Sequence, residues 1–278
     1  MTLNWLQSLV YGLVAGLADI LPISSRAHKL LLLKLFGITG GTELMDLMIH
    51  LGLVAALFIS CQSILIRFNR ARALARVPKR KRRRPLDERS LMDHSLLRTM
   101  LVPVILGLIL YRKALPIEKK LPLLALMLLL NGIFLYIPQF LPTSNRDSRT
   151  LSRVEGLLMG IGGGLAAIPG FSAVGLSNAI GSVCGVERGF ALNMTLLMNM
   201  YLNVGLIVHD IINLAEVGLK GTSFEVVLRC LCAGLAAFGA AFLAIRLVRR
   251  LFQERDYTGF SFYCIGLALF IFILNLLA

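Results

Sequence analysis

A short stretch near the N-terminus concentrates reactive side chains inside an otherwise apolar region. From Asp19 to Lys29 the chain carries one carboxylate, two hydroxyls, a guanidinium, an imidazole and an ammonium group. Ionisable groups in membrane-like segments are costly and usually functional. The donor fork of an arginine matches phosphate geometry, and a histidine can transfer protons or attack phosphorus. These residues predict a pocket for a phosphate or diphosphate group. The alternative is an interfacial loop whose basic side chains reach toward the lipid headgroups.

A second bend, Pro169 to Ser172, repeats part of this pattern with less chemistry. Further along, Asn199 and Asn203 lie four residues apart in an apolar segment, so they share one face of a helix. They either line a polar cavity or form hydrogen bonds between helices. His50 also sits in an apolar segment. It either faces the same cavity or meets a buried partner.

The composition indicates the elements that must position these groups. The chain has 278 residues, of which 57% are hydrophobic and 16% charged. A soluble domain carries about 45–50% apolar and about 25% charged residues. The apolar runs are long and lack a period of two, which argues against an outer-membrane barrel. We therefore expect an all-α integral membrane protein.

Six segments are long enough to cross a bilayer, which takes about 20 apolar residues. They are Leu44–Ile66, Leu96–Tyr111, Leu121–Gln139, Gly189–His209, Phe224–Leu247 and Tyr257–Leu277. Two more apolar regions, 6–36 and 156–184, are broken by proline at the bends described above. Each of their arms has roughly 15 residues and reaches about 22 Å, short of the ~30 Å hydrocarbon core. These regions predict two re-entrant helical hairpins.

The basic residues predict how the chain is oriented. The net charge is +14, and much of the excess lies between Arg67 and Arg89. Basic loops beside membrane spans usually mark the cytoplasmic side, so we expect loop 67–95 to be cytoplasmic and the protein to lie in the inner (plasma) membrane. With that orientation the two hairpins open toward opposite faces, and both termini lie on the outer face. The alternative for the basic stretch is a site for nucleic acid or anionic lipid.

The two bends also indicate an internal duplication. The segment from Ala15 to Pro22 resembles the segment from Gly163 to Pro169 with one residue deleted, and a serine lies three residues past each proline. Together with the opposite orientations, this predicts an inverted repeat with halves 1–140 and 141–278. Inverted repeats with broken helices often bring their bends together at a central site.

These motifs resemble those of the undecaprenyl-diphosphatase family, bacterial membrane enzymes that dephosphorylate a C55 isoprenoid carrier lipid. The family motif E-G-L-T-E-F-L-P-V-S-S-T-G-H corresponds to the segment from Ala15 to His28, and Q-G-L-A-L-I-P-G-I-S-R-S-G corresponds to the segment from Gly163 to Gly175. A third segment, from Met45 to Gly52, has His50 where glutamine is usual. The resemblance implies a fold with two re-entrant hairpins and dephosphorylation of the diphosphate carrier for cell-envelope synthesis.

The chain departs from the family pattern at chemically important positions. Ala15 replaces the first motif glutamate, and Asp19 shortens the second. Arg26 replaces a threonine, and Ala173 replaces the arginine that the family uses for phosphate. Arg26 lies four residues past Pro22, as Ala173 does past Pro169. Our hypothesis is that Arg26 holds the phosphate that the arginine of the second motif would hold.

For a phosphatase, the resemblance and the side chains together assign roles. The predicted phosphate-binding residues are Arg26, Ser24, Ser172, Gly170 and Gly175. His28 or Ser25 attacks or relays a proton, and Asp19 is the base or a weak ligand for Mg²⁺ or Ca²⁺. Asn199, Asn203 and His50 are the predicted cavity-lining residues.

Two other functions fit the sequence. The missing glutamate and arginine favour a relative that binds or flips a phosphorylated lipid or another amphiphile without hydrolysis. A structural membrane scaffold is the third hypothesis. In each case we expect the bilayer and a membrane lipid as partners, no nucleic acid, and a homodimer as a candidate assembly.

Overall fold

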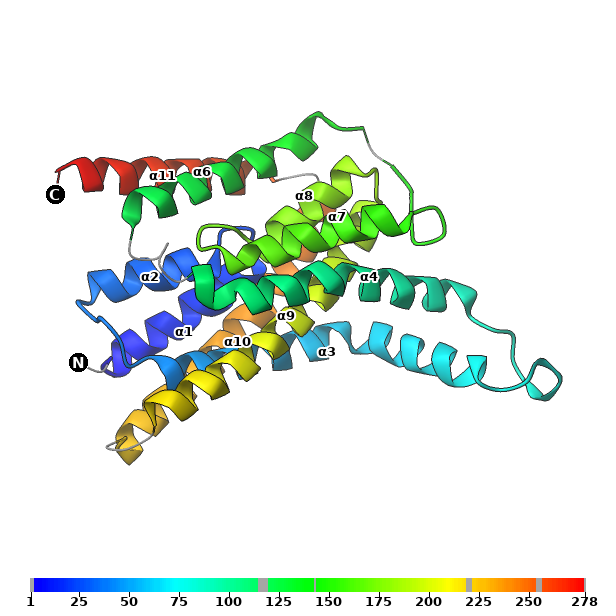
Figure 1. Ribbon diagram of the computed structural model, residues 1–278, viewed down its shortest axis with the longest axis horizontal. Coiled ribbons are helices and arrows are strands. Elements are labelled where there is room, and N and C mark those ends of the chain that lie inside the picture. The colour runs from blue at the N-terminus through cyan, green and yellow to red at the C-terminus, as the bar shows by residue number, and fades with distance from the viewer. Residues whose placement is uncertain (1–2, 115–119, 143, 219–221, 254–256, 278) are drawn as a thin grey trace.

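The computed structural model describes residues 3–114, 120–142, 144–218, 222–253 and 257–277. These residues form an elongated bundle in which the helices run roughly along the long axis (Figure 1). The helices are α1 (Trp5–Ile20), α2 (Ser25–Leu35), α3 (Glu43–Ala75), α4 (Glu88–Leu110), α6 (Leu121–Tyr136), α7 (Arg153–Gly164), α8 (Ala173–Val183), α9 (Arg188–Val217), α10 (Phe224–Gln253) and α11 (Thr258–Leu277). The short 3-10 turns are η1 (Lys79–Lys81), η2 (Tyr111–Ala114), η3 (Ile137–Phe140) and η4 (Leu165–Ala167).

Six helices of the described residues are long and apolar enough to cross a membrane: α3, α4, α6 with η3, α9, α10 and α11. The prediction of an all-α integral membrane protein is confirmed. The predicted bounds were too short for α3 and α4, because hydropathy marks only the lipid-embedded part of a helix. α3 has 33 residues, about 50 Å of helix against a core of ~30 Å. Its basic end and the start of α4 therefore project beyond the bundle as an arm (Figure 1).

Both predicted hairpins are pairs of short helices packed against each other, α1 with α2 and α7 with α8. α1 ends just before Pro22, and Ser24 caps the start of α2. α7 continues into η4 before the bend, and Ser172 caps α8. The four arms have 16, 11, 12 and 11 residues, about 16–24 Å each. They are too short to span, and their entry and exit on one face stays a prediction.

The hairpins and spans pack in a crossed arrangement. α1 lies against α10 of the second half, and α7 lies against α4 of the first half. The contacts are backbone to backbone: a Cβ on Gly16 would lie 2.4 Å from the Ala237 carbonyl oxygen, and one on Gly164 would lie 2.6 Å from that of Pro103. The first spans of the two halves, α3 and α9, also pack together, as do the last, α6 and α11 (Figure 1). This exchange is the packing that an inverted repeat of 1–140 and 141–278 requires, although the repeat itself stays a prediction.

The interior of the bundle lies around α9, which is the most buried of the six spans. α9 contacts α3, α4, α8 and α10. Its polar side chains reach both hairpins, because Asn199 and Asn203 contact Asp19 of α1 and Thr195 contacts Ser177 of α8.

Candidate active site

The two proline-containing bends contact each other inside the bundle. The backbone N–H of Gly170 donates to Ser24 Oγ over 3.1 Å. In return, Ser172 Oγ donates to the Leu21 carbonyl over 3.4 Å. Ser24 has a φ of +68°, a conformation that a residue with a side chain rarely adopts. The bends thus form one unit, as the sequence predicted.

Asn131 of α6 ties the two bends together and was not identified from the sequence. Its Nδ2 donates to the Pro22 carbonyl over 3.1 Å, and its Oδ1 accepts from the backbone N–H of Ser172 over 3.0 Å. The side chain is fully buried. The one available signal was a single amide in the apolar run that begins at Leu121.

Asp19 meets the two predicted asparagines. Its Oδ2 accepts from Asn199 Nδ2 at 2.8 Å and from Asn203 Nδ2 at 3.1 Å. The end of α1 is therefore joined to the middle of α9. The asparagines therefore make interhelical hydrogen bonds, and neither of them is among the residues that line the cavity beside Asp19.

Arg26 bridges from the first bend to the second hairpin. Its guanidinium donates to the Ala167 carbonyl and lies over the Tyr111 ring, 3.9 Å from the ring centroid. The neighbouring Ser25 hydroxyl donates to the Ala15 carbonyl over 3.3 Å. A carbonyl contact and a ring face hold the guanidinium in place next to both bends.

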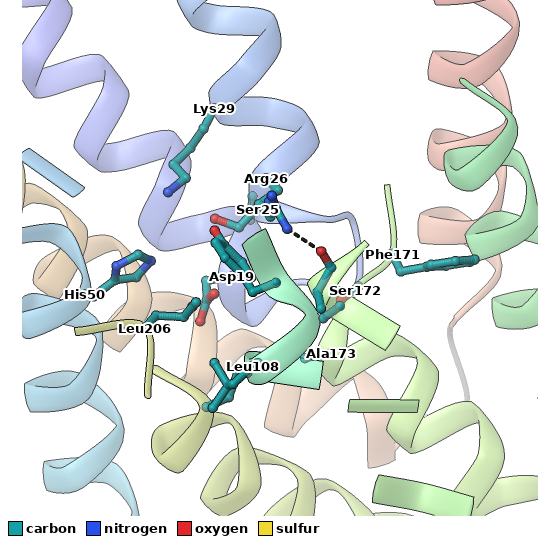
Figure 2. A pocket seen from close by; sticks show the side chains of 15 residues that line it. Asp19, Ser25, Arg26, Lys29, His50, Leu108, Phe171, Ser172, Ala173 and Leu206 are labelled. Atoms are coloured by element: carbon teal, nitrogen blue, oxygen red, sulfur yellow. Dashed lines mark hydrogen bonds between the residues drawn. The ribbon is translucent and has the colours of Figure 1, made fainter. Parts of the chain in front are cut away.

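These groups line one cavity between the hairpins (Figure 2). Its polar lining residues are Asp19, Ser25, Arg26, Lys29, His50, Tyr111 and Ser172. Ala173 lines the same cavity as Arg26, which is the placement that the hypothesis of a relocated arginine needs. Leu108, Leu202 and Leu206 form apolar walls. The cavity therefore combines a cation, hydroxyls and a carboxylate with surfaces suited to an isoprenoid chain.

A second cavity adjoins the first and shares Arg26, Lys29, His50 and Tyr111 with it. It is lined by the first residues of α3 and the last turns of α9. These ends lie opposite the basic arm, so the second cavity lies at the end of the bundle away from loop 67–95.

His50 and Lys29 each pair with a carboxylate in this region. His50 Nδ1 lies 2.5 Å from Asp210 Oδ2. Lys29 Nζ lies 2.9 Å from Asp46 Oδ1, and Asp46 also accepts from Tyr11 and Thr42. Asp210 was not identified from the sequence, because it is 160 residues from His50 and near the end of its span.

The structure does not bring His28 to either cavity. Its Nδ1 bonds to the Ser24 carbonyl at 2.8 Å, and its Nε2 bonds to Tyr263 Oη at 2.7 Å. The ring also stacks on that of Tyr263. His28 thus faces α11, because it lies two residues past Arg26 on a helix and so points to another side. The expected sharing of one cavity by Arg26 and His28 is not observed.

Three predicted phosphate-binding residues hold the bends together instead. Ser24 accepts from Gly170, and the Gly175 N–H donates to Ser172 Oγ over 3.1 Å. A Cβ on Gly175 would lie 2.8 Å from Pro22 Cβ, so this glycine permits close packing. Of the predicted set, Arg26 and Ser172 line the cavity.

The donor set gives little support to the predicted Mg²⁺ or Ca²⁺ ion at Asp19. No group of three or more His, Cys, Asp or Glu side chains suited to a metal occurs in the described ranges. The cavity carboxylates already have protein donors: amides at Asp19, Lys29 at Asp46 and His50 at Asp210. These residues do not fit a divalent ion, and the metal stays a prediction.

Comparison with known proteins gives matches over most of the chain. The model of a family described as bacitracin resistance protein BacA matches residues 8–270. Undecaprenyl-diphosphatase 1 of Shouchella clausii is 28% identical over 284 residues, covering 98% of this chain and 96% of the relative. The undecaprenyl-diphosphatase of Methanobrevibacter smithii is 27% identical over 274 residues, covering 95% and 96%. That of Pelotomaculum thermopropionicum is 32% identical over 203 residues, covering 72% of each chain. The similarity extends from the first hairpin to the last span.

Proposed function

Because this chain belongs to the bacitracin resistance protein BacA family, we propose that it hydrolyses undecaprenyl diphosphate to undecaprenyl phosphate and inorganic phosphate. The matched relatives are named undecaprenyl-diphosphatases. The observation that carries the proposal is the convergence of Arg26, Ser25 and Asp19 on one cavity between the two hairpins. The proposed product serves cell-envelope synthesis.

Arg26 is the proposed phosphate ligand. It is anchored to the second hairpin at Ala167 and packed on Tyr111, so little side-chain entropy is lost when it binds an anion. The small side chain of Ala173 leaves room beside it. The guanidinium then offers donors to the terminal phosphate and stabilises the negative charge of the transition state.

Ser25 and Asp19 are the proposed residues beside the reacting phosphorus. The Asp19 carboxylate is oriented by Asn199 and Asn203, and the Ser25 hydroxyl lies at the start of α2. Phosphoryl transfer depends mainly on positioning and charge stabilisation, and a rigid pair of bends supplies both. The contacts of His28 favour a structural role for it, with Tyr263 as its partner.

The membrane orientation supports access from the outer face. The chain is a multi-pass membrane protein, and its second cavity lies at the end of the bundle away from the basic arm. With loop 67–95 cytoplasmic and the protein in the inner membrane, the diphosphate enters from the outer leaflet. The isoprenoid chain then leaves along the apolar walls into lipid. A homodimer stays a prediction.

Phosphate release from C55 diphosphate by the purified chain in detergent, with and without divalent metal, tests the proposal. We expect release by the wild-type chain, and a fall in kcat/KM of about 10²–10³-fold for Arg26→Ala. Arg26→Lys recovers part of the rate, because lysine keeps the charge but lacks the fork. The matched control is Arg80→Ala in the exposed turn η1. Lipid binding by the wild-type chain without phosphate release would refute hydrolysis, and full activity of Arg26→Ala would refute the role of Arg26.

A further inference from the structure

A buried histidine–aspartate pair adjoins the cavity and comes from two different spans. His50 lies in α3 and Asp210 in α9, and their side chains are 6% and 10% exposed. The His50 Nδ1 to Asp210 Oδ2 distance is 2.5 Å. We propose that His50 is the general base of the hydrolysis and that Asp210 is the residue that positions it. This inference rests on the proposed function.

The hydrogen bond determines which imidazole nitrogen can accept a proton. Asp210 accepts from Nδ1, so the neutral ring carries its proton there and keeps its lone pair on Nε2. The carboxylate also stabilises the imidazolium that forms when Nε2 takes a proton. His50 lines both cavities. In Figure 2 its ring extends from its helix toward Asp19 and Lys29. The pair therefore has the orientation that a base requires.

The remaining side chains of the cavity leave the role of base open. Ala15 provides no carboxylate. Asp19 is held by two amide donors, and Asp46 is paired with Lys29. His50 contacts its carboxylate partner through Nδ1 and lines both cavities, so its Nε2 is placed to take the proton.

The proposed step is the attack of a water molecule on the terminal phosphorus. His50 Nε2 removes a proton from a water molecule, whose oxygen bonds to the terminal phosphorus of the diphosphate. The bond from that phosphorus to the bridging oxygen breaks, and its electron pair stays on the bridging oxygen, which becomes a phosphate oxygen of the monophosphate. Inorganic phosphate leaves, and His50 returns its proton to water in the adjoining cavity.

Other titratable groups surround His50, so its contribution must be isolated by substitution. Those that line the two cavities are Tyr11 and Asp19 of α1, Arg26 and Lys29 of α2, Glu43 and Asp46 of α3, Tyr111 of η2, and His209 and Asp210 of α9. A pH profile of the wild-type chain combines all of them. A change of profile on replacing His50 alone reports on this histidine.

The test is phosphate release from C55 diphosphate, measured against pH, by the full chain and by His50→Gln, Asp210→Asn and the double variant. Glutamine fills a similar space and can still donate to Asp210. We expect His50→Gln to lower kcat by about 10²–10⁴-fold with little change in KM, and to lose the acidic limb of the profile. The double variant is no slower than the slower single variant, because the pair acts as a unit. The control is His94→Gln, whose ring packs on Phe68 at the other end of the bundle.

A structural role predicts other results. The proposal is overturned if His50→Gln keeps the acidic limb of the wild-type profile, or if its kcat is only a few-fold lower than that of the wild type. The histidine then only joins α3 to α9 through its contact with Asp210. A loss of rate that follows a fall in melting temperature, with an unchanged profile, has the same meaning. A wild-type chain that releases no phosphate removes the proposed function, and the base with it. Activity without dependence on His50 removes the base alone.

Discussion

Replacement of Asn131 by leucine tests whether the contact between the bends stabilises the protein. Leucine has a similar volume, so the change leaves no large cavity. It removes the two hydrogen bonds to the bends and a third, weak one to Cys264 Sγ at 3.5 Å. The Ser172 N–H and the Pro22 carbonyl lose their partners at 3.0 and 3.1 Å. A buried group left unpaired costs about 1–3 kcal/mol, which gives about 2–6 kcal/mol for both groups.

A residual contact places the expected value in the lower half of that range. The Pro22 carbonyl also accepts from Cys264 Sγ over 3.7 Å, a weak hydrogen bond that persists in the variant. A loss of about 3 kcal/mol corresponds to a melting temperature lower by about 6–12 °C. Phosphate release at a permissive temperature should also fall, because Ser172 and Arg26 line a cavity that depends on the contact between the bends.

Thermal unfolding of the purified chain in detergent measures this effect. The matched control is Asn69→Leu on the exposed face of α3, which should change the stability by no more than about 0.5 kcal/mol. If Asn131→Leu unfolds at the same temperature as the control, the two bends do not depend on Asn131, and the account of the site as one rigid unit is wrong.

Two further predictions concern packing and charge. Gly16→Leu places a side chain 2.4 Å from the Ala237 carbonyl and should prevent recovery of folded protein by size-exclusion chromatography, whereas Gly266→Leu, with open space around it, should fold normally. In the loop before α7, hydrogen bonds from Arg149 lower the pKa of Asp147 below its usual range. Stability from this pair is present above the unfolded pKa of Asp147 and is lost as pH falls through the folded pKa. Arg149→Ala should therefore unfold at a lower temperature than the wild-type chain at pH 6 and at the same temperature below the folded pKa; an equal difference at both pH values would contradict this.

Much of the fold could be predicted because lipid imposes simple constraints. Runs of apolar residues marked the six spans, and proline marked the bends where the short helices end. The ends of α3 and α4 could not be predicted from hydropathy. Beyond the lipid, charged side chains do not interrupt a helix, so α3 continues to Ala75.

Many residues of the site could be identified from the sequence, but the contacts between them could not. Asp19, Asn199 and Asn203 were each singled out, but their contact joins residues 180 or more positions apart. Sequence periodicity predicts which residues share a helix face, but it does not predict contacts between residues so far apart in the chain. Asn131 and Asp210 had no motif around them, and their partners lie on segments far away in the sequence.

His28 shows a different reason for failure. The residues after Pro22 were treated as a bend, whereas α2 begins at Ser25. Within a helix, successive residues turn by about 100°, so Arg26 and Lys29 share a face and His28 lies about 200° from Arg26. The register of a helix has to be known before neighbouring side chains can be assigned to one cavity.

The packing of α1 on α10 has a consequence for biosynthesis. Gly16 packs against Ala237. Ala237 is synthesised more than two hundred residues after Gly16. At about 5–20 residues per second, the first hairpin spends about 10–40 s in the membrane before its partner exists. During that interval insertion machinery or lipid must shield its polar bend. Two fragments divided between α6 and α7 should therefore reassemble only when they are produced together in the same membrane.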